Sequence, residues 1–133
     1  MKLTVFALLL AFCTAVAGCG GSANSNSVCA ITAIKVFPAT ATVDHTATPP
    51  ASSQHFDAFE TSASNGCSFQ LSALQNATWT VSDSLDASIG NQQNVNYGTA
   101  TCINAAPSPI TVTATVPSGN GTNVSATAAL TCN

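Results

Sequence analysis

The residues best able to do chemistry in this sequence are its six cysteines, Cys13, Cys19, Cys29, Cys67, Cys102 and Cys132. Cys13 lies in an almost wholly apolar run from Val5 to Val16, which follows Lys2. Such a run has the length of the apolar core of an export signal, whereas a membrane-spanning helix needs about 20 apolar residues. We therefore predict that residues 1–18 are a cleaved signal peptide. Cleavage leaves five cysteines, and an odd number is unusual in an exported protein.

Cys19 follows the small residues Val16-Ala17-Gly18, and this tetrapeptide resembles the lipobox of bacterial lipoproteins, in which the cysteine sulfur takes a diacylglycerol. The alternative is a cut after Ala17 by a general signal peptidase, with Cys19 as an ordinary cysteine. Lipidation accounts for the odd count, because it leaves four cysteines that can pair. The resemblance implies a bacterial cell-envelope protein, anchored in a membrane (we expect the outer membrane) through Cys19. Residues 19–27 then form the lipidated cysteine and a flexible tether.

His45 and His55 are the only histidines, and they flank a loop rich in Pro, Ser and Thr. A metal or catalytic pair would need a third group, which Asp44 or Asp57 could provide. Neither histidine has a recognised motif spacing. We therefore expect both to be solvent-facing residues at the ends of a loop.

Asp83 and Asp86 stand close together with Ser82 and Ser84, so four side-chain oxygen ligands for calcium are within reach of one loop. Asp and Ser are equally common turn formers, and we expect that role here. The sequence contains no G-x-S-x-G, P-loop or H-E-x-x-H motif. It therefore predicts no catalytic residue, no metal site and no cofactor.

The segment after residue 18 carries very few charges. Lys35 is its only basic side chain, and five acidic side chains bring its net charge to −4. Because nucleic-acid binding relies on a basic surface, the sequence excludes a nucleic acid as partner. Ser, Thr and Asn provide the polar surface instead, which is typical of an extracytoplasmic β protein.

From Val28 onward the sequence has strand periodicity, and only residues 67–75 could form a short helical turn. The clearest strands, 110–116 and 124–132, alternate apolar residues with Thr and Ser. Placing Val116 opposite Val124 puts every apolar residue of the pair on one face. Further strands are expected at residues 30–38, 55–61, 78–82, 87–89 and 95–103. About seven strands predict an all-β, two-sheet sandwich over residues 28–133.

The predicted strands also indicate how the four remaining cysteines pair, although three pairings are possible. Consecutive antiparallel strands would bring Cys29 near Cys67. Cys132 points with the apolar residues of the last strand, and Cys102 lies near the end of the strand before the hairpin. We therefore favour disulfides Cys29–Cys67 and Cys102–Cys132. A zinc or redox site is disfavoured, because there is no C-x-x-C motif and the compartment is oxidising.

Several segments, most specifically "WTVSDSLDASI" at residues 79–89, resemble the bacterial Ig-like group 2 domain. The other matching segments are "ITAIKVFPATATV", "HFDAFETSA", "YGTATC" and "ITVTATV", so the resemblance covers about residues 30–131. Two features depart from the family pattern: "GNQQNVN" replaces a glycine-flanked turn, and four cysteines are added. The resemblance implies an Ig-like, extracytoplasmic domain without catalytic residues.

Together these observations predict a non-enzymatic lipoprotein whose domain is an interaction or structural module of the cell envelope, with a surface protein or a glycan as partner. The alternative is a carbohydrate-binding surface module, which a set of exposed aromatic side chains on one sheet would favour. Trp79 lies on an alternating strand and is expected in the core. Phe37, Phe59, Phe69 and Tyr97 are the candidates for an exposed binding patch.

Overall fold

The chain folds into β-strands joined by turns and loops. The computed structural model describes residues 29–68 and 70–133, which form nine strands and no helix. The strands are β1 (Ile31–Phe37), β2 (Thr40–Val43), β3 (Ser53–His55), β4 (Asp57–Ala63), β5 (Thr78–Val81), β6 (Ala87–Ile89), β7 (Thr99–Cys102), β8 (Ile110–Pro117) and β9 (Asn123–Cys132). The predictions on the signal peptide, Cys19, the tether and Phe69 lie outside the described residues.

The β8–β9 hairpin has the register that the alternation predicts. Val116 pairs with Val124, and Ile110 pairs with Leu130. The inward side chains of β8 are all buried, whereas its Thr residues face outward or lie half-buried. Because successive side chains of a strand point to opposite faces, this register gives the hairpin one apolar face.

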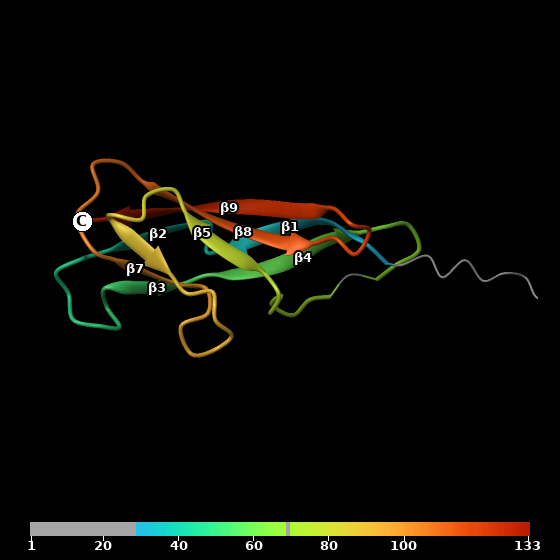
Figure 1. Cartoon of the computed structure of the whole chain (residues 1–133), viewed down its shortest axis with the longest axis horizontal. Helices are drawn as coiled ribbons and strands as arrows, with labels where there is room; N and C mark the ends of the chain where they lie inside the picture. Colours follow the sequence, from blue (N-terminus) through green and yellow to red (C-terminus); the bar gives the residue numbers. More distant parts are fainter. Residues whose placement is uncertain (1–28, 69) are drawn as a thin grey trace, which may run out of the picture.

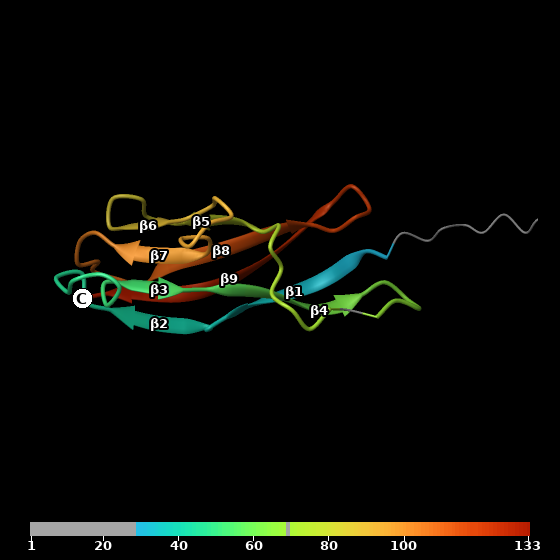
Figure 2. The same ribbon diagram turned by 90° about the horizontal axis from the view of Figure 1, so that it is seen from below.

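The strands form a β-sandwich, as expected. One sheet has the order β2-β9-β8-β5, a second has the order β3-β7-β6, and β1 pairs with β4. Strands β3 and β4 are almost collinear halves of one long green strand in Figure 1, separated by Phe56. Seen from below, β3 and β7 lie in front of β8 and β9 (Figure 2).

The structure has nine strands rather than about seven, because two strands were not predicted. β2 lies outside every predicted strand, and β3 overlaps the predicted strand 55–61 only at His55, where Phe56 separates it from β4. The first strand ends before Pro38. Proline has no N–H for the ladder with β4. The chain therefore leaves β4 and pairs in parallel with β9, Thr40 opposite Ala129. The segment 67–75, which could have formed a helical turn, contains no helix among its described residues.

The core lies between the sheets and combines a few large side chains with many small ones. Trp79, Phe56 and Leu130 are its largest fully buried side chains, and alanines fill much of the remainder. Gly98 is required next to this core, because its φ is +68° and a Cβ there would lie 2.4 Å from the Phe56 carbonyl oxygen. A side chain at position 98 would therefore push apart β3–β4 and the start of β7.

An asparagine covers the outer edge of β5. The side-chain oxygen of Asn91 accepts a hydrogen bond from the Trp79 N–H at 2.5 Å, and its side-chain nitrogen donates to the Trp79 carbonyl at 2.6 Å. The amide thus binds Trp79 as a neighbouring strand would. An unpaired strand edge is open to pairing with other chains, and Asn91 occupies this edge at its central position.

Candidate functional site

The four predicted disulfide cysteines form the favoured pairs. Cys29–Cys67 joins the start of β1 to the segment after β4, with a Cα–Cα distance of 5.8 Å. Cys102–Cys132 joins β7 of one sheet to β9 of the other, with a Cα–Cα distance of 5.6 Å. All four therefore serve the framework, and none of these thiols is left for metal or redox chemistry.

Trp79 and Tyr97 are both buried, which confirms the prediction for Trp79 and contradicts that for Tyr97. Trp79 is 1% exposed, which confirms its place in the core. Tyr97, expected in an exposed patch, is only 9% exposed. Its hydroxyl donates to the Ala77 carbonyl at 2.8 Å, and its ring meets Trp79 edge-on at 6.4 Å. The loop that contains Tyr97 folds back onto the segment before β5, and this long-range contact buries the ring.

Phe37 and Phe59 do lie together on the outer face of the β1–β4 ladder. Phe37 is 63% exposed and Phe59 is half-buried, and Lys35 stands directly opposite Phe59. These side chains line a groove of about 530 Å³ together with Leu71, which is 85% exposed. The groove combines exposed apolar side chains with Lys35, the only basic residue after position 18. We call it the β1–β4 groove.

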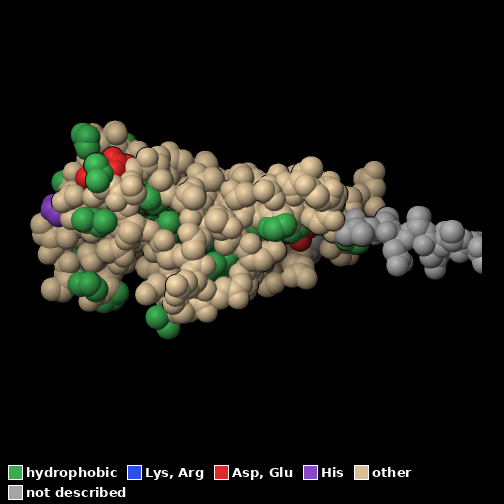
Figure 3. Space-filling view, viewed as in Figure 1, with side chains coloured by type: hydrophobic (Ala, Val, Ile, Leu, Met, Phe, Trp, Pro, Cys, Tyr) green, Lys and Arg blue, Asp and Glu red, His purple; other side chains and the backbone are tan. Residues whose placement is uncertain are grey.

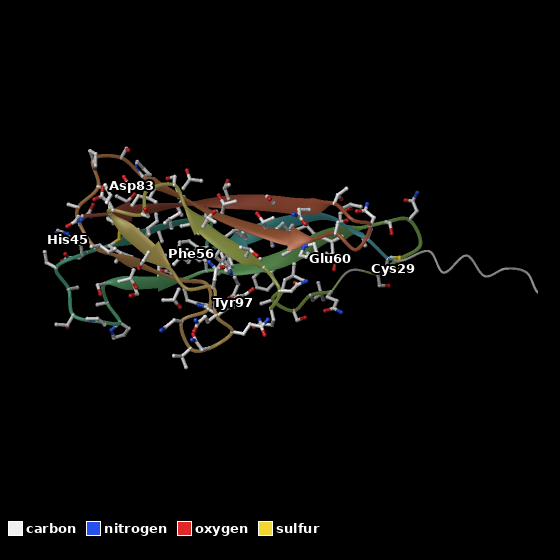
Figure 4. All side chains as sticks on the ribbon, viewed as in Figure 1. Cys29, His45, Phe56, Glu60, Asp83 and Tyr97 are labelled. Atoms are coloured by element: carbon white, nitrogen blue, oxygen red, sulfur yellow. A yellow bond between two sulfur atoms is a disulfide. The ribbon has the colours of Figure 1, made fainter. Side chains whose placement is uncertain are left out.

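Glu60 is a buried carboxylate beside this groove. It lies on the inward side of β4, opposite Ile34, and is 9% exposed. Its Oε2 accepts a hydrogen bond from the Gln70 N–H at 3.0 Å. The segment after Gln70 runs along β4, where the Leu74 N–H donates to the Ala58 carbonyl at 2.8 Å. Figure 4 shows Glu60 and Cys29 toward the end at which the described chain begins, and His45 and Asp83 at the other end.

A second hollow, of about 560 Å³, is also lined by Glu60. Glu60 lines both hollows, so the two are adjacent. We call the second one the amide cleft, because four amide side chains line it, from Gln70, Gln75, Asn76 and Gln93. Gln93 comes from the loop between β6 and β7, and its side chain donates to the Gln75 carbonyl. The cleft thus depends on chain segments that are far apart in the sequence.

The two histidines are not brought into one site, because each binds different partners. His55 Nε2 lies 3.2 Å from Asp57, and its Nδ1 lies 3.2 Å from the hydroxyl of Thr99, its cross-strand partner. Both His55 and Asp57 are open to solvent. The site therefore lacks the water-excluded surroundings in which the imidazole could activate the Thr99 hydroxyl as a nucleophile. His45 binds the main-chain oxygen of Asn133 at the end of the described chain.

Two of the aspartates, Asp83 and Asp44, act as turn formers. Asp83 Oδ1 accepts hydrogen bonds from the N–H groups of Leu85 and Asp86 at 2.9 and 3.3 Å. Asp44 Oδ1 accepts from the hydroxyl and the N–H of Thr46, and these two hydrogen bonds lower the pKa of Asp44. Over residues 29–68 and 70–133, no three His, Cys, Asp or Glu side chains gather as a metal site would require.

The sequence predicted part of the exposed surface but missed the amide cleft. Leu71, Glu60 and Gln93 were not singled out, although Glu60 has a signal in the sequence. It shares the inward face of a predicted strand with Phe56 and Ala58, and a carboxylate on such a face is unusual. No comparable pattern in the sequence indicates that the four amide side chains of the cleft come together.

No family model matches this chain, and no curated protein matches it either. The resemblances to bacterial lipoproteins and to the bacterial Ig-like group 2 domain therefore stay predictions. In the described part of the chain, no helix is long and apolar enough to cross a membrane.

Proposed function

We propose that the protein is a non-enzymatic lipoprotein of the bacterial cell envelope, anchored through a lipid on Cys19. Its Ig-like sandwich acts as an interaction or structural module outside the cytoplasm. The observation that carries the binding role is the β1–β4 groove, because the exposed side chains of Phe37 and Leu71 line the same hollow. Figure 3 shows few charged side chains on this face of the molecule.

The non-enzymatic role is supported by the use of the residues that could react. The four described cysteines are paired, and the aspartates at residues 83 and 44 hold turns. The remaining pair, His55 and Asp57, lines neither the β1–β4 groove nor the amide cleft. A carbohydrate-binding surface module is the second candidate, and the exposed aromatic ring of Phe37 beside that of Phe59 favours it.

Anchoring is tested by the intact mass of the protein purified from its own membranes. We expect a diacylglyceryl group on Cys19 and a gain of four hydrogens on reduction, because two disulfides open. Cys19→Ser should move the protein to the soluble fraction. A mature chain that begins at Gly18, without a lipid, would refute the anchoring.

The groove is tested by co-sedimentation of the Cys19→Ser protein with isolated cell envelopes. Phe37→Ser removes an exposed ring from the groove and should reduce the sedimented fraction severalfold. Leu85→Ser is the matched control, because Leu85 is 78% exposed and lies outside the groove. Equal sedimentation of both variants would exclude the β1–β4 groove as the binding surface.

A further inference from the structure

The amide cleft offers paired hydrogen-bond donors and acceptors. Each Gln or Asn side chain presents a carbonyl acceptor and two N–H donors. Four such groups converge there with the hydroxyl of Ser72, and all five side chains are exposed enough to reach a ligand. Glu60 adds a carboxylate, which is an acceptor only. A ligand that matches this lining must itself carry many groups that both donate and accept hydrogen bonds.

The charge of the cleft restricts the ligand further. No Lys or Arg lines it, and Glu60 is the one ionisable side chain among its described lining residues apart from the disulfide-bonded Cys29. A phosphate or carboxylate ligand would meet a negative group without a positive partner. Lys35 lies on the outer face of the β1–β4 ladder rather than in the cleft. The lining therefore favours an uncharged ligand.

Apolar surface adjoins these polar groups. Ile31 and Leu74 are half-buried in the lining of the cleft, and Glu60 also lines the groove that contains Phe37 and Phe59. A sugar ring has hydroxyls on its rim and C–H groups on its faces, so it matches both kinds of surface. The cleft, of about 560 Å³, has room for more than one sugar unit.

The walls of the cleft are held in place before any ligand binds. The Cys29–Cys67 disulfide holds one end, and the main-chain bond from Leu74 to Ala58 holds the crossing segment. On the remaining side, Gln93 of the loop between β6 and β7 donates a hydrogen bond to the Gln75 carbonyl. A pre-organised site loses less conformational entropy on binding.

We infer that the amide cleft binds a neutral oligosaccharide, with its hydroxyls on Glu60 and the four amides and a sugar face on the adjoining apolar surface. This inference rests on the proposed function in that it names the ligand class of the same module. It needs no chemical step, because the saccharide is held and not cleaved.

The test is titration calorimetry of the purified mature protein with cellotetraose and with chitotetraose, which differ in their acetamido groups. We expect at least one of them to bind, and Asn76→Ala and Gln70→Ala each to weaken binding by about tenfold, the effect of losing a ligand hydrogen bond of about 1.4 kcal/mol. Gln92→Ala, in the same loop as Gln93 but outside the cleft lining, should leave the affinity unchanged. Both loss variants change exposed side chains, and Trp79 fluorescence checks that they fold.

Three results would overturn the inference. They are the absence of binding by both saccharides at millimolar concentration, equal binding by the loss variants and the native protein, and equally tight binding of tetragalacturonate, which is anionic. Membrane attachment through Cys19 and sedimentation through Phe37 are measured separately. If those persist while saccharide binding fails, only this inference falls.

Discussion

The bond between Asn91 and the edge of β5 gives the sharpest test of the structure. Asn91→Ala removes two hydrogen bonds, of 2.5 and 2.6 Å, to the main chain of Trp79. Each is worth about 0.5–1.5 kcal/mol, so the free energy of unfolding should fall by about 1–3 kcal/mol. A domain of this size loses about 4–8 °C in Tm for each kcal/mol. We therefore expect Tm to fall by roughly 5–20 °C.

The single tryptophan makes the assay simple, because Trp79 is buried and its fluorescence reports unfolding in urea. Gln92→Ala is the control, since this exposed residue lies in the same loop and should change stability by less than about 0.5 kcal/mol. The variant should also self-associate in sedimentation velocity runs, because its β5 edge is uncovered. If Asn91→Ala is as stable and as monomeric as Gln92→Ala, the amide does not act as a substitute strand.

Three further predictions concern the framework. Replacing both Cys102 and Cys132 by Ala opens a crosslink with a sequence separation of 30 and should cost about 3–4 kcal/mol in urea unfolding; a loss below 1 kcal/mol would contradict that role. Tyr97→Phe removes the hydrogen bond to the Ala77 carbonyl and should cost about 1 kcal/mol in thermal unfolding, whereas an unchanged Tm would mean that water replaces this bond. Thr46→Val should raise the pKa of Asp44 in an NMR titration, because the hydroxyl that stabilises the carboxylate is lost. In the native protein, Asp44 stabilises the fold at pH values above its unfolded pKa. This contribution disappears as the pH falls through the lowered pKa of the folded state.

The sequence predicted part of the β1–β4 groove but not the amide cleft. Phe37 and Phe59 fall outside the apolar faces of their strands, and alternation alone was enough to expect them near the surface. Tyr97 failed the same argument, because it belongs to a connection whose burial depends on a segment 20 residues earlier. The amide cleft needs Glu60, Gln75 and Gln93 to meet, and no local pattern encodes that meeting.

The sequence by itself determined the all-β character of the described chain and the register of the last hairpin. Both follow from a side-chain period of two over neighbouring segments joined by a short turn. It also favoured the two disulfides that the structure contains, because the order of strands limits which cysteines meet. Only the tertiary structure decided where β2 goes after Pro38, how Tyr97 is buried and where the amides converge. Those features depend on contacts between distant segments, such as β2 with β9 and Gln93 with Gln75, and on the close packing of one loop against another.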